Sequence, residues 1–274
     1  MTSSTTQRAV LLDALTEAAS HFEAEPEDDP LIGWQSRSAG SRVATEQGDR
    51  WLRIVWARPE WARGPWWQGN ESAGVLEGVT RPHVLRTREW DSGPLRLRAE
   101  LMTLVPGEPC SPTQELRTEV ALPDMWWSEL HRSLECLAVQ PTDRQATDQA
   151  TMTRRLRVFF GDRIDPTVTS WTTAHGDLHW NNLHHSEFAL VDWEGWGSAP
   201  AGYDAAGLYC RSLLAPHTAR RVRATFADIL DTPDGVRSQL FAITRLLSRA
   251  DGGEFADLVG PLHQLADHLL ARDR

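Results

Sequence analysis

The stretch AHGDLHWNN, residues 174–182, places several polar side chains close together. His175 and Gly176 stand directly before Asp177, and Asn182 follows Asp177 by five residues. A carboxylate and an amide offer hard oxygen donors, the ligand type that Mg²⁺ prefers. Three interpretations are open for the stretch by itself: a catalytic loop, a metal site built on its histidines, and a polar turn without chemistry.

The residues that follow favour a catalytic loop. The sequence FALVDWE, residues 188–194, predicts a short apolar strand that runs into Asp192, ten residues after Asn182. Asp204 comes twelve residues later and opens an apolar helix. A metal-binding amide and carboxylate, together with a separate carboxylate at Asp177 that can accept a proton, match the template for phosphoryl transfer.

HGDLHWNN followed by VDWE resembles the motif of the aminoglycoside phosphotransferase family, which has a protein-kinase-like fold. That family shows His-Gly-Asp, an asparagine five residues after the aspartate, and a strand ending in Ile/Val-Asp-Trp/Phe-Glu, related to the kinase motifs. The resemblance implies that Asp177 is the catalytic base, that His175 orients the loop, and that Asn182 and Asp192 bind magnesium. It also implies ATP and Mg²⁺ as cofactors and a hydroxylated small molecule as acceptor.

Two turns depart from the family pattern. The family loop usually reads HGDLHPGN, whereas Trp180 and Asn181 occupy the proline and glycine positions here. The family's GDP after the metal-binding aspartate is replaced by Ala199, Pro200 and Ala201. We therefore expect an altered loop shape, with Trp180 large enough to reach a substrate.

The pattern along the chain predicts an α+β protein. Residues 7–21 have apolar residues at helical spacing, and residues 31–105 predict a five-stranded antiparallel sheet with one helix, 71–79, after the third strand. Helical patterns then predominate, beginning with residues 124–139 and 146–161. With the resemblance, this indicates a bilobal protein-kinase-like fold. Residues 1–104 would form a small nucleotide-binding lobe, and residues 105–274 a larger, mainly helical catalytic and substrate lobe, with the catalytic residues in the cleft between them.

Kinase-like folds carry a lysine on the third strand that holds the α and β phosphates and pairs with a glutamate on the next helix. The chain has no lysine, so all 28 of its Lys and Arg residues are arginine. The resemblance therefore assigns the phosphate contact to Arg53 on the third predicted strand. It assigns the pairing carboxylate to Glu71 at the start of the next helix, with Glu77 as a second candidate.

Three further residues are expected to contact the nucleotide. Gly40 lies in SRSAGSR, which predicts a first strand turn over the phosphates. Glu100 and Met102 fall where the resemblance places the hinge to adenine.

The composition narrows the function classes. A net charge of −10 disfavours a nucleic-acid partner, because phosphate binding needs a basic face. Three widely separated cysteines form no zinc motif and fit a reduced, cytoplasmic setting. The sequence shows no signal peptide and no apolar run of ~20 residues that would cross a membrane.

The predicted function is ATP- and Mg²⁺-dependent phosphorylation of a hydroxyl on an aminoglycoside-like or other antibiotic or metabolite. Antibiotic resistance is a hypothesis motivated by the resemblance and by an acidic chain that would suit a cationic acceptor. A nucleotide-binding pseudokinase or regulatory module is the alternative, motivated by Arg53 and Trp180. A metal-dependent hydrolase could use His175 and His179, although Gly176 disfavours the helix that would bring them to one face.

Overall fold

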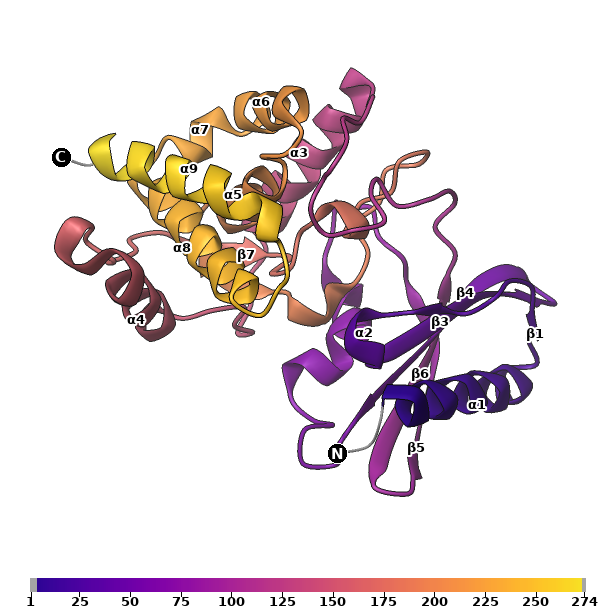
Figure 1. Ribbon diagram of the computed structural model, residues 1–274. Helices are drawn as coiled ribbons and strands as arrows, with labels where there is room; N and C mark the ends of the chain where they lie inside the picture. The colour runs from indigo at the N-terminus through magenta and orange to yellow at the C-terminus, as the bar shows by residue number, and fades with distance from the viewer. Residues whose placement is uncertain (1–3, 273–274) are drawn as a thin grey trace. The chain divides into compact units, whose positions relative to one another are not determined.

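The computed structural model describes residues 4–272. The chain divides into two compact units: Met1–Gly74 with Arg81–Pro106, and Val75–Thr80 with Gly107–Arg274. The first contains the antiparallel sheet and the second is mainly helical (Figure 1). The predicted α+β class and the order of sheet before helices are therefore confirmed.

The first unit is a twisted antiparallel sheet with short helical connections. Within residues 4–272 this sheet has six strands rather than five, in the order β1-β3-β4-β6-β5, with β2 also paired to β3. The additional strand is β1, which lies before the predicted range of 31–105 and, like β2, pairs with β3. The elements are α1 (Ser4–Phe22), β1 (Glu25–Pro26), β2 (Leu31–Ile32), η1 (Trp34–Ser36), β3 (Ser38–Thr45), β4 (Gly48–Ala57), η2 (Pro65–Gln68), α2 (Gly69–Ser72), η3 (Ala73–Val75), β5 (Val84–Ser92) and β6 (Leu95–Thr103).

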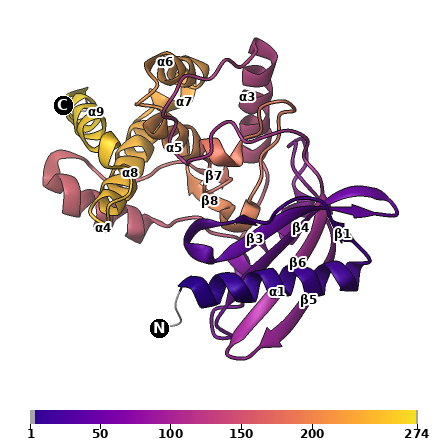
Figure 2. The ribbon, with the colours of Figure 1, turned by 45° about the vertical axis from the view of Figure 1, so that its right-hand side comes forward.

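Helix α1 lies along one face of this sheet (Figure 2). Its buried side chains include Leu11, Leu15 and Phe22, which form one core with Leu52 and Ile54 of β4. The prediction of a helix here is confirmed, although the apolar residue Ala9 is exposed. The larger apolar residues lie on a stripe rotated away from Ala9, and burying them removes more apolar surface from water.

The helix predicted over residues 71–79 is short. Helix α2 begins earlier, at Gly69, and ends at Ser72, after which the 3₁₀ turn η3 continues only to Val75. Gly74 lies within this turn, and Gly78 has a φ of +70°, a conformation that ends a helix.

The second unit packs helices around the small antiparallel sheet of β7 and β8 (Figure 1). The predicted helices at 124–139 and 146–161 are present as α3 and α4. The elements are α3 (Asp124–Ala138), α4 (Gln149–Phe160), η4 (Gly161–Arg163), β7 (Trp171–Ala174), η5 (Trp180–Asn182), η6 (Trp193–Gly195), β8 (Gly197–Pro200), α5 (Tyr203–Arg211), α6 (Pro216–Thr225), α7 (Ala227–Leu230), α8 (Pro233–Ala250), η7 (Ala256–Leu258) and α9 (Val259–Arg272).

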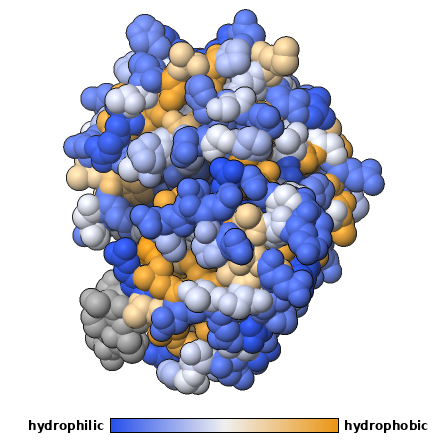
Figure 3. Space-filling model, turned by 90° about the vertical axis from the view of Figure 1, so that its right-hand side faces the viewer, coloured by the Kyte–Doolittle hydropathy of each residue, from blue (hydrophilic) through white to orange (hydrophobic). Residues whose placement is uncertain are grey.

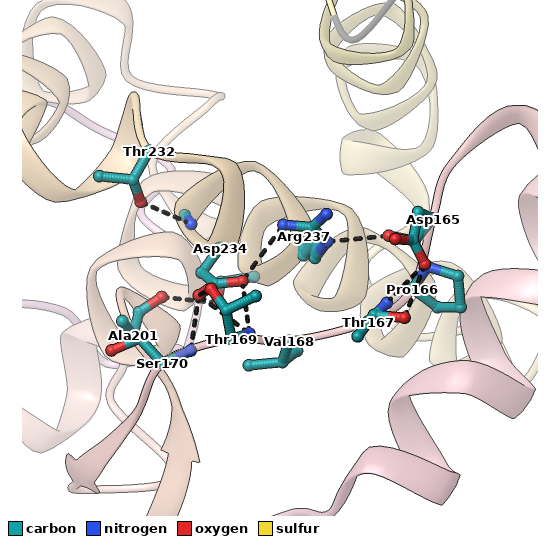
Figure 4. A network of polar contacts seen from close by, with 12 residues as sticks. Asp165, Pro166, Thr167, Val168, Thr169, Ser170, Ala201, Thr232, Asp234 and Arg237 are labelled. Atoms are coloured by element: carbon teal, nitrogen blue, oxygen red, sulfur yellow. Dashed lines mark hydrogen bonds and ion pairs between the residues drawn. The ribbon is translucent and has the colours of Figure 1, made fainter.

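The start of α8 is tied to the chain that enters β7 (Figure 4). Asp234 accepts hydrogen bonds from the backbone N–H of Ser170 at 2.7 Å and from the hydroxyl of Thr169 at 2.7 Å. Thr232 caps the same helix by accepting from the N–H of Gly235 at 3.0 Å. One carboxylate thus fixes both α8 and the strand that leads into residues 175–182.

Hydrophilic side chains predominate on the face drawn in Figure 3, with hydrophobic ones between them. No helix among residues 4–272 combines the length and apolar character needed to cross a bilayer.

Candidate active site

The loop that follows β7 is held by its backbone. Asp204, at the start of α5, accepts hydrogen bonds from the N–H groups of His175 at 2.6 Å and Gly176 at 3.0 Å. Gly176 has a φ of +85°, and a Cβ there would stand 2.1 Å from the carbonyl oxygen of Gly195. Only glycine fits this approach, so the glycine and the distant carboxylate together determine where Asp177 lies.

His175 is completely buried and links the two halves of the motif. Its Nδ1 accepts the backbone N–H of Asp177 at 3.4 Å, and its Nε2 lies 3.0 Å from the carbonyl oxygen of Val191. The second contact assigns the proton to Nε2, because a carbonyl can only accept. Burial lowers the pKa of His175, which agrees with a neutral ring.

The carboxylate of Asp177 lies among positive groups of its own unit. Its oxygens are 3.8 Å from Arg245 of α8 and 3.7 Å from Nε2 of His179. Desolvation opposes ionisation, but attraction to His179, Arg211 and Arg245 outweighs it and lowers the pKa of Asp177. The arginines carry this effect at neutral pH, because burial lowers the pKa of His179 to about 3 and leaves that ring neutral. Asp177 is therefore ionised at neutral pH and able to accept a hydrogen bond from a hydroxyl.

We expect the free energy of unfolding to fall as the pH is lowered from about 6.5 to about 5. An unfolded histidine titrates near pH ~6.5, so below this the unfolded chain binds a proton that the folded, neutral His179 does not. The loss is on the order of 2 kcal/mol for His179 over this interval. Denaturant midpoints of the wild type and His179→Gln at both pH values measure it, and the variant should show the smaller pH dependence.

Exposed His185 provides the control for this titration. A His185→Gln variant should follow the wild type at both pH values, because this exposed side chain lies outside the buried surroundings of His179. Equal pH dependence in His179→Gln and the wild type would contradict the neutral, buried ring.

Asn182 and Asp192 are brought together by backbone pairing rather than by the predicted strand. FALVDWE forms one isolated bridge, Leu183 with Leu190, and the N–H of Val191 donates to the carbonyl of Asn182 at 3.0 Å. The expected strand over residues 188–194 is therefore wrong. Asp192 adopts a left-handed conformation (φ +65°) and η6 begins directly after it.

The residues present suit a magnesium ion. The Nδ2 of Asn182 donates to the carbonyl of Asp177 at 3.1 Å, so its amide oxygen is the atom that can meet a cation. Among the described residues no group of three or more His, Cys, Asp or Glu is arranged to hold a metal. One carboxylate with one amide suits Mg²⁺, which keeps several waters and contacts substrate phosphates, better than zinc, which takes three or four protein ligands.

Trp180 belongs to the core and does not line the loop surface. Its side chain is fully buried, its indole N–H donates to the hydroxyl of Ser212 at 3.0 Å, and its ring packs against Trp126 and Trp127. The expectation that Trp180 could reach a substrate is therefore wrong, because the indole points into the space among α3, α5 and the loop.

Arg53 meets a different carboxylate from the expected one. Arg53 on β4 and Glu100 on β6 are directly paired in register, so their side chains share a face and approach to 3.3 Å. The carboxylate of Glu71 pairs with Arg98 at 2.7 Å instead. The amide of Asn70 also donates to Glu100 at 2.8 Å.

The predicted hinge and turn residues lie inside strands. Glu100 and Met102 are buried within β6, which continues to Thr103, so the chain leaves the sheet later than expected. Gly40 lies in β3 opposite Arg53, whereas the turn before this strand is formed by η1. A Cβ on Gly40 would stand 2.4 Å from the ring of Trp51, so this glycine makes room for an indole.

Three arginines whose charges act on Asp177 or His179 were not found from the sequence: Arg211 on α5, and Arg245 and Arg249 on α8. Their signal is the spacing of four residues between Arg245 and Arg249, which puts both on one face of a helix. Arginines at this spacing are common on exposed helix faces, so the pattern does not indicate a site by itself.

The chain matches no family model and no curated protein sequence. It is similar in structure to aminoglycoside phosphotransferase APH(4)-Ia, with a TM-score of 0.62 and 12% identity over 96% of this chain and 98% of that one. A thermostable mutant of that protein, in a ternary complex with ADP and hygromycin B, gives a TM-score of 0.60 at 13% identity over 94% and 97% of the two chains. The GDP complex of aminoglycoside 2'-phosphotransferase-IIIa gives 0.52 at 14% identity over 96% and 99%.

These similarities define the class of fold. The chain has the protein-kinase-like fold of the aminoglycoside phosphotransferases, as the motif HGDLHWNN…VDWE predicts.

Proposed function

We propose that the protein is an ATP- and Mg²⁺-dependent phosphotransferase that moves the γ-phosphate to a hydroxyl of a small molecule. The observation that carries the proposal is the loop after β7, where Asp204 accepts two backbone hydrogen bonds and fixes the position of the ionised Asp177 next to Asn182. Similar folds that bind ADP with hygromycin B, or GDP, support a nucleotide as the donor.

Each polar group of the loop has a role in this proposal. Asp177 accepts the proton of the acceptor hydroxyl as the hydroxyl oxygen attacks the γ-phosphorus. The bond between the γ-phosphorus and the oxygen that bridges it to the β-phosphate then breaks. His175 holds the loop through the carbonyl of Val191. Asn182 and Asp192 would hold the magnesium, which supplies charge neutralisation to the phosphates.

Residues 1–104, the predicted small lobe, would bind the nucleotide, and residues 105–274 would provide catalysis and bind the acceptor. Arg53, held by Glu100 on the face shared by β4 and β6, would contact the α and β phosphates. Glu71 would contribute indirectly, through Arg98 and its bond to Glu100. Gly40 and the chain after Met102 would line the nucleotide through their backbones.

The acceptor class in this proposal is a hydroxylated small molecule, either an aminoglycoside-like antibiotic or a metabolite. The alternative is a pseudokinase, which would bind the nucleotide and transfer nothing. Arg53 favours that alternative, because its planar guanidinium is bulkier than the compact ammonium of the lysine that usually contacts the phosphates.

Titration calorimetry with AMP-PNP, with and without Mg²⁺, tests the donor site. We expect magnesium-dependent binding in the wild type and binding at least about tenfold weaker in Asp192→Ala, since one charged metal contact contributes over 1.4 kcal/mol. Asp162→Ala is the matched control, because the side chain of Asp162 is 99% exposed. A folded wild type that binds no nucleotide would exclude the proposal, and binding without transfer to any acceptor would support the pseudokinase.

A further inference from the structure

A group of arginines surrounds Asp177 within the second unit. Arg245 approaches its carboxylate to 3.8 Å, and the charge of Arg211 also acts on it. Asp177, Arg211 and Arg245 line one small cavity of about 10 Å³ together with Tyr203 and Gly207. Arg249 lies one helical turn beyond Arg245 on α8, and its charge acts on Arg211 and His179.

Arg211 is buried without an acidic partner. Only 4% of its surface is exposed, and no carboxylate of the described residues lies within ion-pair distance of it. One Nη donates to the carbonyl of Gly207 at 3.2 Å, and Nε has no hydrogen-bond partner in the part of the chain that the structure describes. A buried cation in this state is costly unless an anion compensates it.

The acidic groups nearby offset the charge of these cations only in part. The carboxylate of Asp204 accepts hydrogen bonds from the backbone N–H groups of His175 and Gly176. Glu254 pairs with Arg249 at 2.5 Å. Arg155 adds a further positive charge next to Arg245. The hydroxyl of Tyr203, which Arg245 contacts, is neutral because burial raises its pKa.

This charge distribution bears on the acceptor, whose reacting hydroxyl must reach Asp177. An ammonium group beside that hydroxyl would meet like charges, and like-charge contacts in a recognition site cost several kcal/mol. A carboxylate or phosphate would instead meet guanidinium groups, whose planar forks match both anions. Glu254 and Asp257, which follow α8, are already paired with Arg249 and Arg117 and are therefore occupied groups for an incoming ammonium.

We propose that the acceptor is an acidic hydroxylated molecule, with a carboxylate or phosphate that binds Arg245 and Arg249 while its hydroxyl meets Asp177. Arg211 supports this anion from behind as a buried positive charge. The inference rests on the proposed phosphotransferase function and narrows its acceptor class. An acidic acceptor is opposite in charge to the cationic acceptor that the net negative charge of the chain suggests.

The test is calorimetric binding of four six-carbon probes that differ in charge: gluconate, glucose 6-phosphate, glucose and glucosamine. The protein is first saturated with magnesium AMP-PNP, so that the nucleotide sites for phosphate are filled, and ionic strength is held constant. We expect gluconate or glucose 6-phosphate to bind at least about tenfold more tightly than glucosamine. The stronger of the two anions identifies the source as a carboxylate or a phosphate.

Arg249→Gln should weaken the bound anion about tenfold, and Arg157→Gln should leave it unchanged at the same net charge. Arg157 is the matched arginine, since it pairs with exposed Asp162 on the surface. For an acid that is phosphorylated, Arg249→Gln should raise the acceptor KM and change kcat little, which a purely structural role would not do.

Tighter binding of glucosamine, or no binding of either anion by the nucleotide-loaded protein, would overturn the inference and leave the phosphotransferase intact. Failure to load magnesium AMP-PNP would overturn both together.

Discussion

Replacement of Asp177 by asparagine is expected to lower kcat by about 10²- to 10⁴-fold, the usual contribution of a positioned general base. Asparagine has nearly the same shape but cannot accept a proton at neutral pH. The loop should keep its position, because Asp204 holds it through the backbone N–H groups of His175 and Gly176 and not through the carboxylate of Asp177. Single-turnover phosphate transfer, with AMP-PNP affinity measured in parallel, separates loss of chemistry from loss of binding.

Asp162→Asn is the control for this experiment, as it makes the same change at an exposed carboxylate. It should match the wild type in both readouts. Transfer by Asp177→Asn within about threefold of the wild type would show that another group takes the proton, since a general base contributes far more. A variant that has lost nucleotide affinity as well would indicate that the carboxylate supports the metal instead.

Truncation of Trp180 to alanine is expected to lower the free energy of unfolding by about 3–5 kcal/mol, the range for deleting a large buried aromatic side chain. The indole is fully buried, contacts Trp126 and Trp127, and donates a hydrogen bond to Ser212. Its removal therefore leaves a cavity inside the core, where no exposed side chain can fill it. Trp180→Phe should cost less, because most of the ring volume remains and about 1 kcal/mol of hydrogen bonding is lost. Chemical denaturation followed by far-UV circular dichroism measures both variants.

Trp61→Ala supplies the matched control, since 64% of the surface of Trp61 is exposed and its removal leaves no cavity. Its effect should stay within about 0.5 kcal/mol. If Trp180→Ala unfolds as late as Trp61→Ala, then Trp180 does not pack in the core, and a substrate-facing position would again be open.

Features that lie within one segment could be predicted from the sequence, whereas contacts between distant segments could not. The motif around Asp177 and the alternation that buries Leu52 and Ile54 each lie within one short segment, and both could be recognised in the sequence. The partner of Arg53 could not, because the choice of Glu100 over Glu71 depends on the register between β4 and β6. Sequence alone does not determine strand register in such detail.

The same reason explains the other differences. FALVDWE has the composition of a strand, but its only bridge is at Leu190, and the left-handed conformation of Asp192 followed by η6 ends the extended segment. The environment of Arg211 could not be predicted from the sequence either, because the groups near it come from the loop and from α8 as well as from its own helix. Burial and charge balance are properties of the assembled unit and not of any one segment.

Asp204 holds the loop after β7 by accepting two hydrogen bonds, and this affects how related chains can be recognised. It binds main-chain atoms, so it sets few requirements on the side chains between the loop and α5. Substitutions such as tryptophan at position 180 can therefore accumulate while the position of Asp177 stays constant. A search for related chains would gain sensitivity by scoring the intervals among Asp177, Asn182, Asp192 and Asp204, and by giving little weight to the letters that separate them.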